Sequence, residues 1–223
     1  MPGNSRITRI LLADDHEIVR RGLRQILTEA LRGTSYGEAS NPGEIIRIVL
    51  KSKWDLVILD SLFPGRNGLE VLKDIRRHRP DLPVLVLSLY TDEQLAIRAL
   101  RAGASGYLAK QSTSAEIVAA VRKVIAGGRF VTPSLAERLA REIQSGGEKV
   151  PHERLSDREF QVFELLAAGL TVKRVAERLN LSAQTVSTHR VRILDKMKME
   201  SNADLVRYAA QHHLLDEGYG PVD

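Results

Sequence analysis

The sequence predicts an α/β domain built on a five-stranded, doubly wound parallel sheet, followed by a small domain made only of helices. Through the first half of the chain, short runs that are apolar on both faces alternate with amphipathic helical patterns. Such alternation is typical of a buried parallel sheet with helices on both faces. Beyond residue 128 the apolar runs stop and only helical patterns remain. The length of 223 residues suits two domains rather than one.

The five expected strands lie at 10–13, 36–39, 56–59, 84–87 and 106–109, and the second of these runs is the weakest. Helical patterns lie between and after them at 17–31, 42–52, 68–78, 92–102 and 113–126. We expect Asn41, which precedes a proline, and Thr91, which precedes two acidic residues, to cap the second and fourth of these helices.

The second half begins after Gly127 and Gly128, which end the strand-helix alternation. A short helix is expected at 134–144, and the glycine, polar and proline residues of 145–151 indicate a linker. Ser156 and Glu159 form a capping-box pattern that begins the next helix. Helices are expected at 156–168, 171–179, 182–197 and 201–214. The expected division is therefore residues 1–128, a linker with a short helix at 129–151, and a second domain at 152–223.

Composition excludes several classes of protein. The chain has no cysteine, so disulfides and cysteine metal sites are excluded. Neither a signal peptide nor an apolar stretch of roughly 20 residues is present, so we expect a cytoplasmic protein without membrane contact. The net charge is +5, but residues 152–223 hold 10 Lys and Arg against 11 Asp and Glu. Because the basic surplus lies in the first half, bulk charge does not predict DNA binding by the second.

Polar residues follow four of the expected strands. Asp14 and Asp15 follow the first, Asp60 the third, Ser88 the fourth and Lys110 the fifth. The carboxyl ends of parallel strands meet at one edge, where open α/β sheets bind ligands. Three carboxylates there repel one another, and their oxygen atoms suit Mg²⁺. An Asp can accept a phosphoryl group whose charge Mg²⁺ and a Lys neutralise. Taken singly, each residue is more often a cap or a solvated charge, but together they predict a phosphoryl-accepting site.

Four segments sharpen this prediction: LLADDH at 11–16, DLVILD at 55–60, PGRNGLEVL at 64–72 and GASGYLAK at 103–110. On these segments residues 7–126 resemble the receiver domain of response regulators. The resemblance implies a flavodoxin-like sheet of order 2-1-3-4-5. It also implies the site roles: Asp60 as phosphoacceptor; Asp14, Asp15, Asp60 and the backbone carbonyl of Leu62 as Mg²⁺ ligands, Asp14 mainly through water; Ser88 and Tyr107 as a switch pair; and Lys110 as a phosphate contact.

The sequence departs from the receiver pattern at two positions. Phe63 stands where family members often carry Met, and this exchange leaves the chemistry intact because no side chain there is a ligand. Gln111 stands where many receivers carry Pro, which leaves open whether the Lys110–Gln111 peptide is cis.

The second half carries LSDREFQVF at 155–163, AGLT at 168–171, VAERL at 175–179 and TVSTH at 185–189. On these segments residues 155–210 resemble the LuxR-type helix-turn-helix, and the whole chain resembles the NarL/FixJ group of response regulators. The resemblance implies a transcription regulator that binds double-stranded promoter DNA. A histidine kinase would phosphorylate it, and phosphorylation would switch homodimer formation and promoter binding.

The helix at 182–198 is the expected recognition helix, with Val186, Ile193, Leu194 and Met197 packed inward. An ordinary amphipathic helix with a solvated face is the alternative. The expected DNA contacts are Lys173, Gln184, Thr185, Ser187, Thr188, Arg190, Val191, Arg192 and Lys196. We expect a dimer contact on the last helix through Leu205, Val206, Ala209 and Ala210, although packing within their own domain explains part of that face equally well.

The sequence argues against two other classes of function. A phosphatase of the haloacid-dehalogenase type carries a second Asp two positions after its nucleophile, whereas this chain has Leu62 there. The sequence therefore predicts no turnover enzyme, only slow loss of the protein's own phosphoryl group. A receiver-like domain used only for dimerisation is disfavoured by the complete set of Asp14, Asp15, Asp60, Ser88 and Lys110. No glycine-rich loop follows the first strand, so a nucleotide cofactor is not expected.

Overall fold

The computed structural model describes residues 7–88, 93–144, 150–212 and 214. The chain divides into two compact units, Met1–Glu137 and Arg138–Asp223, and each is described by itself. Within the described residues, no helix is both long and apolar enough to cross a membrane.

The first unit is built on a parallel sheet with the order β2-β1-β3-β6-β7. Its strands are β1 (Thr8–Ala13), β2 (Thr34–Ala39), β3 (Leu56–Asp60), β6 (Val84–Ser88) and β7 (Gly106–Ala109). This order confirms the predicted doubly wound sheet. Two short strands, β4 (Leu62–Phe63) and β5 (Arg66–Asn67), were not predicted; they pair antiparallel directly after β3. Gly65 adopts a φ of 72° in the turn between them, a conformation that glycine reaches without strain.

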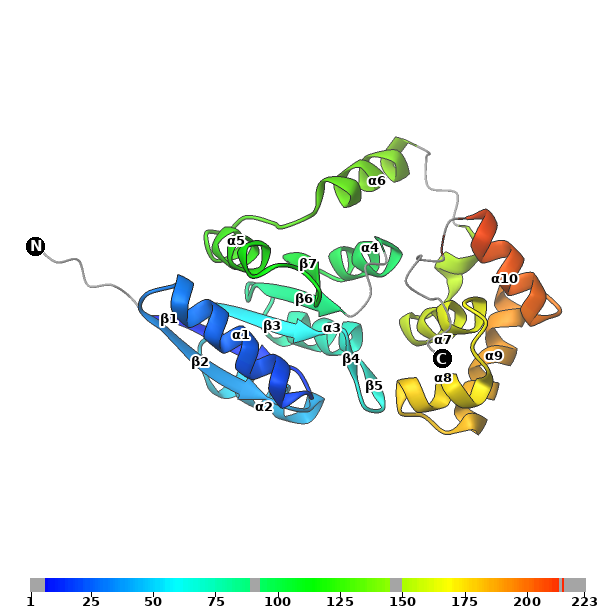
Figure 1. Cartoon of the computed structure of the whole chain (residues 1–223), viewed down its shortest axis with the longest axis horizontal. Helices are drawn as coiled ribbons and strands as arrows, with labels where there is room; N and C mark the ends of the chain where they lie inside the picture. Colours follow the sequence, from blue (N-terminus) through cyan, green and yellow to red (C-terminus); the bar gives the residue numbers. More distant parts are fainter. Residues whose placement is uncertain (1–6, 89–92, 145–149, 213, 215–223) are drawn as a thin grey trace, which may run out of the picture. The chain divides into compact units, whose positions relative to one another are not determined.

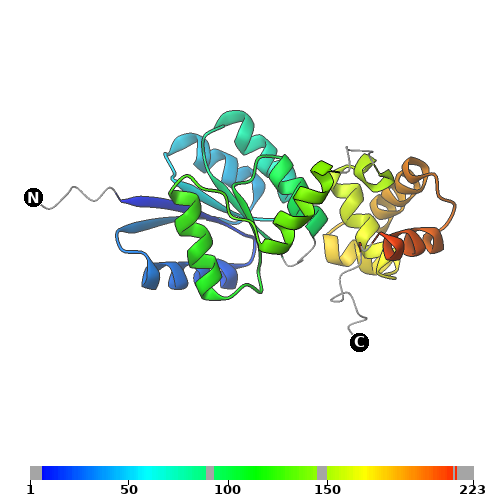
Figure 2. The ribbon, with the colours of Figure 1, turned by 90° about the horizontal axis from the view of Figure 1, so that it is seen from above.

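Helices cover both faces of the sheet (Figures 1 and 2). One face carries α1 (Glu17–Ala30) and α5 (Ser114–Ile125), whose buried Leu23, Leu27 and Ile117 share a core cluster with Ile10 and Leu12 of β1. The other face carries α2 (Pro42–Lys51), α3 (Gly68–His78) and α4 (Glu93–Arg101). Because both faces are covered, every residue of β3 and β6 is buried.

Local sequence signals begin several of these helices. The Asn41 side chain accepts a hydrogen bond from the Glu44 amide at 3.0 Å, which confirms the predicted cap of α2. Thr113 and Glu116 form a capping box at the start of α5. The predicted cap residue of α4, Thr91, lies outside the described residues.

The second unit contains the four predicted helices: α7 (Asp157–Ala167), α8 (Val172–Leu179), α9 (Ala183–Met197) and α10 (Asn202–Gln211). Helix α7 contacts each of the other three and carries Phe160 and Phe163, both fully buried. A 3₁₀ turn at Pro151–Arg154, which the sequence did not predict, packs against α9. The boundary between the two units falls within α6 (Pro133–Gln144).

Candidate functional site

The carboxyl edge of the sheet gathers acidic side chains around one lysine. Asp14 follows β1 and Asp60 ends β3, and both are almost completely buried, at 2% and 3% exposure. The Lys110 Nζ atom, just after β7, lies 2.6 Å from Asp14 Oδ2 and 2.8 Å from Asp60 Oδ2. The topology explains this convergence, because parallel strands end on the same side of the sheet. The structure thus brings Asp14, Asp15, Asp60 and Lys110 to one site, as the sequence predicted.

The electrostatics of this edge oppose ionisation of Asp60 when no metal ion is bound. Burial and then the neighbouring Asp14 carboxylate raise the pKa of Asp60 to about 7, although Lys110 and the Leu62 amide oppose them. Burial lowers the pKa of Lys110, but the Asp60 and Asp14 carboxylates outweigh it and raise that pKa above its ordinary value. One lysine therefore does not fully compensate the carboxylates of the edge.

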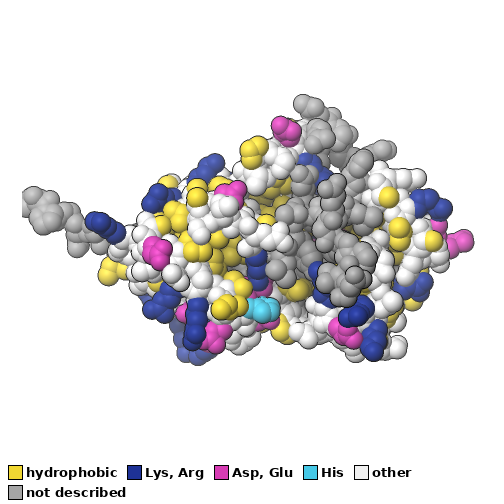
Figure 3. All heavy atoms as spheres, viewed as in Figure 1, with side chains coloured by type: hydrophobic (Ala, Val, Ile, Leu, Met, Phe, Trp, Pro, Cys, Tyr) yellow, Lys and Arg dark blue, Asp and Glu magenta, His cyan; other side chains and the backbone are white. Residues whose placement is uncertain are grey.

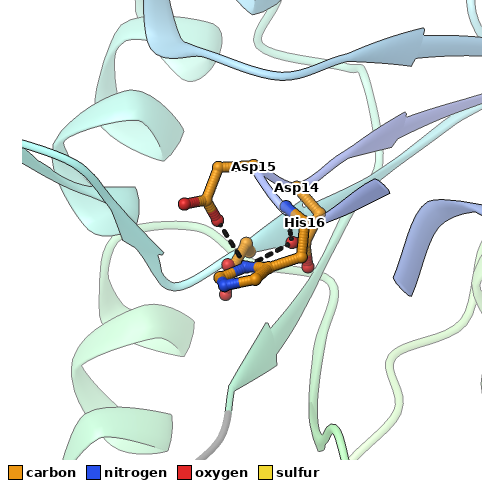
Figure 4. A group of neighbouring side chains, drawn as sticks. Asp14, Asp15 and His16 are labelled. Atoms are coloured by element: carbon orange, nitrogen blue, oxygen red, sulfur yellow. Dashed lines mark hydrogen bonds and ion pairs between the residues drawn. The ribbon is translucent and has the colours of Figure 1, made fainter. Parts of the chain in front are cut away.

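Asp14, Asp15, His16 and Asp60 each offer a ligand atom within 4.8 Å of the others, so the group can hold a cation (Figure 4). Two buried oxygens, Asp14 Oδ2 and Asp15 Oδ1, lie in ion pairs but accept no hydrogen bond from the described residues. Clustered carboxylate oxygens of this kind fit a hard cation such as Mg²⁺.

His16 belongs to this group, although the sequence analysis assigned it no role. Its Nδ1 atom lies 2.8 Å from Asp15 Oδ1 and 3.3 Å from Asp14 Oδ1, while its backbone amide donates to Asp14 Oδ1 at 2.8 Å. The side chain stays 60% exposed at the rim. Its position directly after the paired aspartates was the one signal available in the sequence.

The predicted switch residues lie beside the acidic cluster. Ser88 ends β6 and is fully buried; its Oγ accepts a hydrogen bond from the Ser61 hydroxyl at 3.0 Å. Tyr107 in β7 is 4% exposed. The sequence interpretation missed Ser61, although it directly follows Asp60. Among the described residues no peptide bond is cis, so the Lys110–Gln111 bond is trans.

The chain leaves Asp60 through a tightly packed turn. The Leu62 amide donates to Asp60 Oδ1 at 3.3 Å, and the Gly68 amide donates to the Ser61 carbonyl at 2.9 Å. Asn67 caps α3 through the Leu69 amide at 2.7 Å. A Cβ atom on Gly68 would lie 2.1 Å from the Asp60 carbonyl oxygen, so only glycine fits at this close approach.

In the second unit, α8 and α9 form a helix-turn-helix. Asn180 ends α8 with a φ of 51°, in the left-handed region that Asn tolerates. The Ser182 hydroxyl then accepts from the Thr185 amide at 3.0 Å and caps α9. Val186, Ile193 and Met197 of α9 are buried as predicted, and Leu194 is partly buried. The left-handed residue and the cap together make the sharp turn between the two helices.

The opposite face of α9 is open to solvent. Val191 is 62% exposed, an unusual exposure for a large apolar side chain. Ser187 is half-buried, and the Thr188 hydroxyl donates to the Gln184 carbonyl of its own helix at 3.0 Å. The exposed members of the predicted DNA-contact set are Lys173, Gln184, Thr185, Thr188, Val191, Arg192 and Lys196.

Two predicted phosphate contacts already have partners within the unit. The Lys196 Nζ atom donates to Glu159 Oε2 at 2.6 Å, and Arg190 Nε donates to Asn202 Oδ1 at 2.6 Å. Burial raises the pKa of Glu159, but its hydrogen bonds with Lys196 and Ser156 outweigh burial and lower that pKa below its ordinary range. Lys196 therefore ties α9 to the capping box of α7, and the sequence pattern did not reveal this contact.

The predicted dimer face needs a correction. Leu205 and Ala209 are fully buried inside the unit, because α10 packs against α7 along that side. They are core residues and offer no surface to a partner. Val206, at 38% exposure, and Ala210 remain on the exposed side of the helix.

Comparison with known proteins gives matches to both units. A family model described as the response regulator receiver domain matches residues 10–122, and one described as bacterial regulatory proteins of the luxR family matches residues 153–209. The response regulator UvrY of Escherichia coli K12 is 34% identical over 208 residues, which cover 93% of this chain and 95% of that protein. The response regulator GacA of Pseudomonas viridiflava is 33% identical and covers 93% of this chain and 98% of its own.

Solved structures give a similar result. RcsB from Salmonella enterica serovar Typhimurium, bound to the promoter rprA in the presence of the phosphomimetic BeF₃⁻, matches with a TM-score of 0.60 and 27% identity, covering 91% of this chain and 98% of that one. A structure of two RcsB dimers bound to two parallel DNAs matches with a TM-score of 0.56 and 28% identity, covering 91% of this chain and 98% of that one.

Proposed function

Because the chain belongs to the NarL/FixJ group of response regulators, and is a DNA-binding transcription regulator of a two-component system, we propose that a phosphoryl group on Asp60 switches it. The observation that carries the proposal is the burial of Asp60 beside Asp14, within hydrogen-bonding distance of Lys110. The proposed division is a receiver at 1–128, a linker at 129–151 and a DNA-binding domain at 152–223. A cytoplasmic location and a cognate histidine kinase as donor complete the proposal.

In the proposed reaction an Asp60 carboxylate oxygen attacks phosphorus, and the phosphorus–nitrogen bond of the donor phosphohistidine breaks as the new bond forms. Asp14, Asp15, Asp60 and the Leu62 carbonyl would hold Mg²⁺, which neutralises charge on the transferring phosphoryl group. Lys110 would move from Asp60 to a phosphate oxygen. The Ser88 hydroxyl would contact another phosphate oxygen, and Tyr107 would change rotamer in response to that contact. No carboxylate stands at position 62, so slow loss of the phosphoryl group is the only onward chemistry in the proposal.

In the DNA-binding domain, α9 would enter the major groove. Gln184, Thr185, Ser187, Thr188 and Val191 would face the bases, and Lys173, Arg190, Arg192 and Lys196 would hold phosphates. The exposed Val206 and Ala210 remain as the proposed dimer contact on α10. The dimeric, DNA-bound state of RcsB supports a dimer on two half-sites.

Replacing Asp60 with Asn is expected to abolish labelling by radioactive acetyl phosphate in Mg²⁺, because the amide cannot act as the nucleophile. The measurement is protein-bound label after gel electrophoresis that hydroxylamine removes, as expected for an acyl phosphate, with Asp55→Asn as the matched control. Asp55 lies at the opposite end of β3 and should label as the wild type does. Equal labelling of the Asp60 variant would overturn the site assignment.

Removing a phosphate contact is expected to weaken binding to all DNA sequences alike, whereas removing a base contact should change the preference at one position. Lys173→Ala is the cleaner phosphate variant, because Lys173 is exposed and forms no ion pair with the described residues, whereas Lys196 also pairs with Glu159. We expect Lys173→Ala to lower the salt slope by about one unit. Thr188→Ala should lower the discrimination against the wrong base by roughly 1–3 kcal/mol at one base pair and leave the other base pairs unaffected.

Binding to specific and scrambled DNA across a salt series checks both variants. A loss of specificity in Lys173→Ala, together with a uniform loss of affinity in Thr188→Ala, would reverse the proposed orientation of α9 in the groove.

A further inference from the structure

The basic surplus of the chain gathers at one edge of the receiver, opposite the phosphoacceptor. We define the basic edge as Arg9 together with the last turn of each receiver helix and the loop after it, which are residues 27–33, 48–55, 75–83, 98–105 and 122–130. It holds twelve Lys and Arg but only three acidic residues, Glu29, Asp55 and Asp81. The formal net charge of these residues is therefore +9, against −3 for the rest of residues 1–151, and Asp74, just outside the edge, pairs with Arg77 at 2.8 Å and offsets one of these charges. The receiver is thus strongly polarised from one edge to the other.

Side-chain contacts join neighbouring loops of the basic edge. The Arg122 guanidinium of α5 donates to the Ala30 carbonyl at the end of α1 at 2.9 Å, and Arg79 after α3 donates to the Ser52 carbonyl after α2 at 3.4 Å. The Arg9 guanidinium lies 4.9 Å from the centre of the Trp54 ring. The loops therefore hold one another in place, and their charges act together. In Figure 3, Lys and Arg side chains gather at the end of the receiver where β1 begins.

Part of this charge has a structural purpose, because the carboxyl ends of five helices meet at the same edge. Each helix end carries a partial charge of about −0.5, so five ends offset about 2.5 positive charges. A surplus of about six remains after that offset. Arg32, Lys51, Lys53 and Lys123 are exposed, and none of them forms an ion pair with a carboxylate of the described residues. Helix ends alone do not account for this edge.

We propose that the basic edge of the receiver binds the phosphate backbone of the DNA that the C-terminal domain recognises. DNA is the polyanion that this chain binds, and the C-terminal domain carries no net positive charge, with 10 Lys and Arg against 11 Asp and Glu in residues 152–223. Because the two domains are covalently linked, contact of the edge with the bound DNA would be intramolecular. The receiver then adds to the sequence-independent affinity that the phosphate contacts of α8 and α9 supply, and the C-terminal domain supplies the sequence preference.

The test compares charge-neutralising pairs in the full-length chain. Lys51→Gln with Lys53→Gln removes two charges from the α2 side of the edge, and Arg32→Gln with Lys123→Gln removes two from the α1 and α5 side. The matched control is Arg21→Gln with Arg24→Gln, two largely exposed arginines on α1, 74% and 61% exposed, outside the edge. Anisotropy with promoter and scrambled duplexes, from low to moderate salt, gives the affinity and the salt slope.

An edge pair that contacts phosphates should lower the slope of log K against log salt by nearly two units and weaken both duplexes at least 10-fold at 0.1 M salt. The control pair should change the affinity less than threefold. The ratio between promoter and scrambled DNA, and labelling by acetyl phosphate, should stay unchanged in all variants. If neither edge pair differs from the control pair, the proposal is overturned. A loss of labelling or of sequence preference in an edge pair would also contradict the proposal, because it assigns the edge neither role.

Discussion

Replacing Asp60 with Asn should stabilise the metal-free protein at pH 8 by on the order of 4 kcal/mol. The folded protein raises the pKa of Asp60 from 3.8 to about 7, so folding disfavours the ionised carboxylate. The free-energy cost of ionising Asp60 in the folded protein is absent below the pKa of the unfolded state. It grows as the pH rises from 4 to 7 and is complete above 7. A shift of about three pKa units corresponds to about 4 kcal/mol. Asn has the size of the carboxyl group but no charge, and therefore avoids this cost.

Urea unfolding in EDTA, followed by tryptophan fluorescence, measures this difference. Trp54 is the one tryptophan of the chain and lies in the receiver, so its signal reports on that domain. The gain in the free energy of unfolding should fall toward zero as the pH approaches 4. Glu70→Gln, a substitution on the surface of α3 where the carboxylate is 48% exposed, should change stability by less than about 1 kcal/mol at every pH. A wild type that is more stable than the Asn variant at pH 8 would contradict the electrostatic account of the site.

Substituting Gly68 with Ala should destabilise the receiver by about 3 kcal/mol or more and abolish phosphoryl acceptance. A Cβ atom there would lie 2.1 Å from the Asp60 carbonyl oxygen and 2.8 Å from Ser61 backbone atoms. Because those atoms belong to the backbone at the end of β3, the clash can be relieved only if Asp60 itself is displaced. The same unfolding and labelling measurements detect the effect.

Gly22→Ala provides the matched control for Gly68→Ala. Gly22 lies inside α1, and a Cβ atom there meets nothing within 4 Å. Because alanine favours the helix, this variant should gain about 0.5–1 kcal/mol and label normally. Similar behaviour of the two variants would show that the close approach at Gly68 does not hold Asp60 in place.

The sheet and its acidic edge could be predicted because both depend on local signals. Strands that are apolar on both faces reveal a parallel sheet, and residues directly after such strands must share an edge. Asp14, Asp60 and Lys110 meet for this reason. The caps at Asn41 and Ser156 were visible for a similar reason, since a cap depends on residues three positions apart.

Features that depend on packing between distant segments were not predictable in the same way. The Lys196–Glu159 pair joins residues 37 positions apart, and helical periodicity says nothing about which partner a charged residue meets. Leu205 and Ala209 were placed on a dimer face because periodicity shows that a helix has an apolar side but not what covers it. Their burial against α7 follows from the packing of α10. The short hairpin of β4 and β5 has too few residues to carry a strand pattern.

The most direct test of the phosphorylation switch is promoter binding by the full-length chain with and without a small phosphodonor. Genomic fragments are first screened by mobility shift, and a bound fragment is then titrated with wild type and Asp60→Asn in Mg²⁺, each with and without acetyl phosphate. The account predicts that the donor raises the affinity of the wild type and leaves that of the Asn variant unchanged. Equal affinity of the wild type with and without the donor, in a preparation shown to be labelled on Asp60, would contradict it.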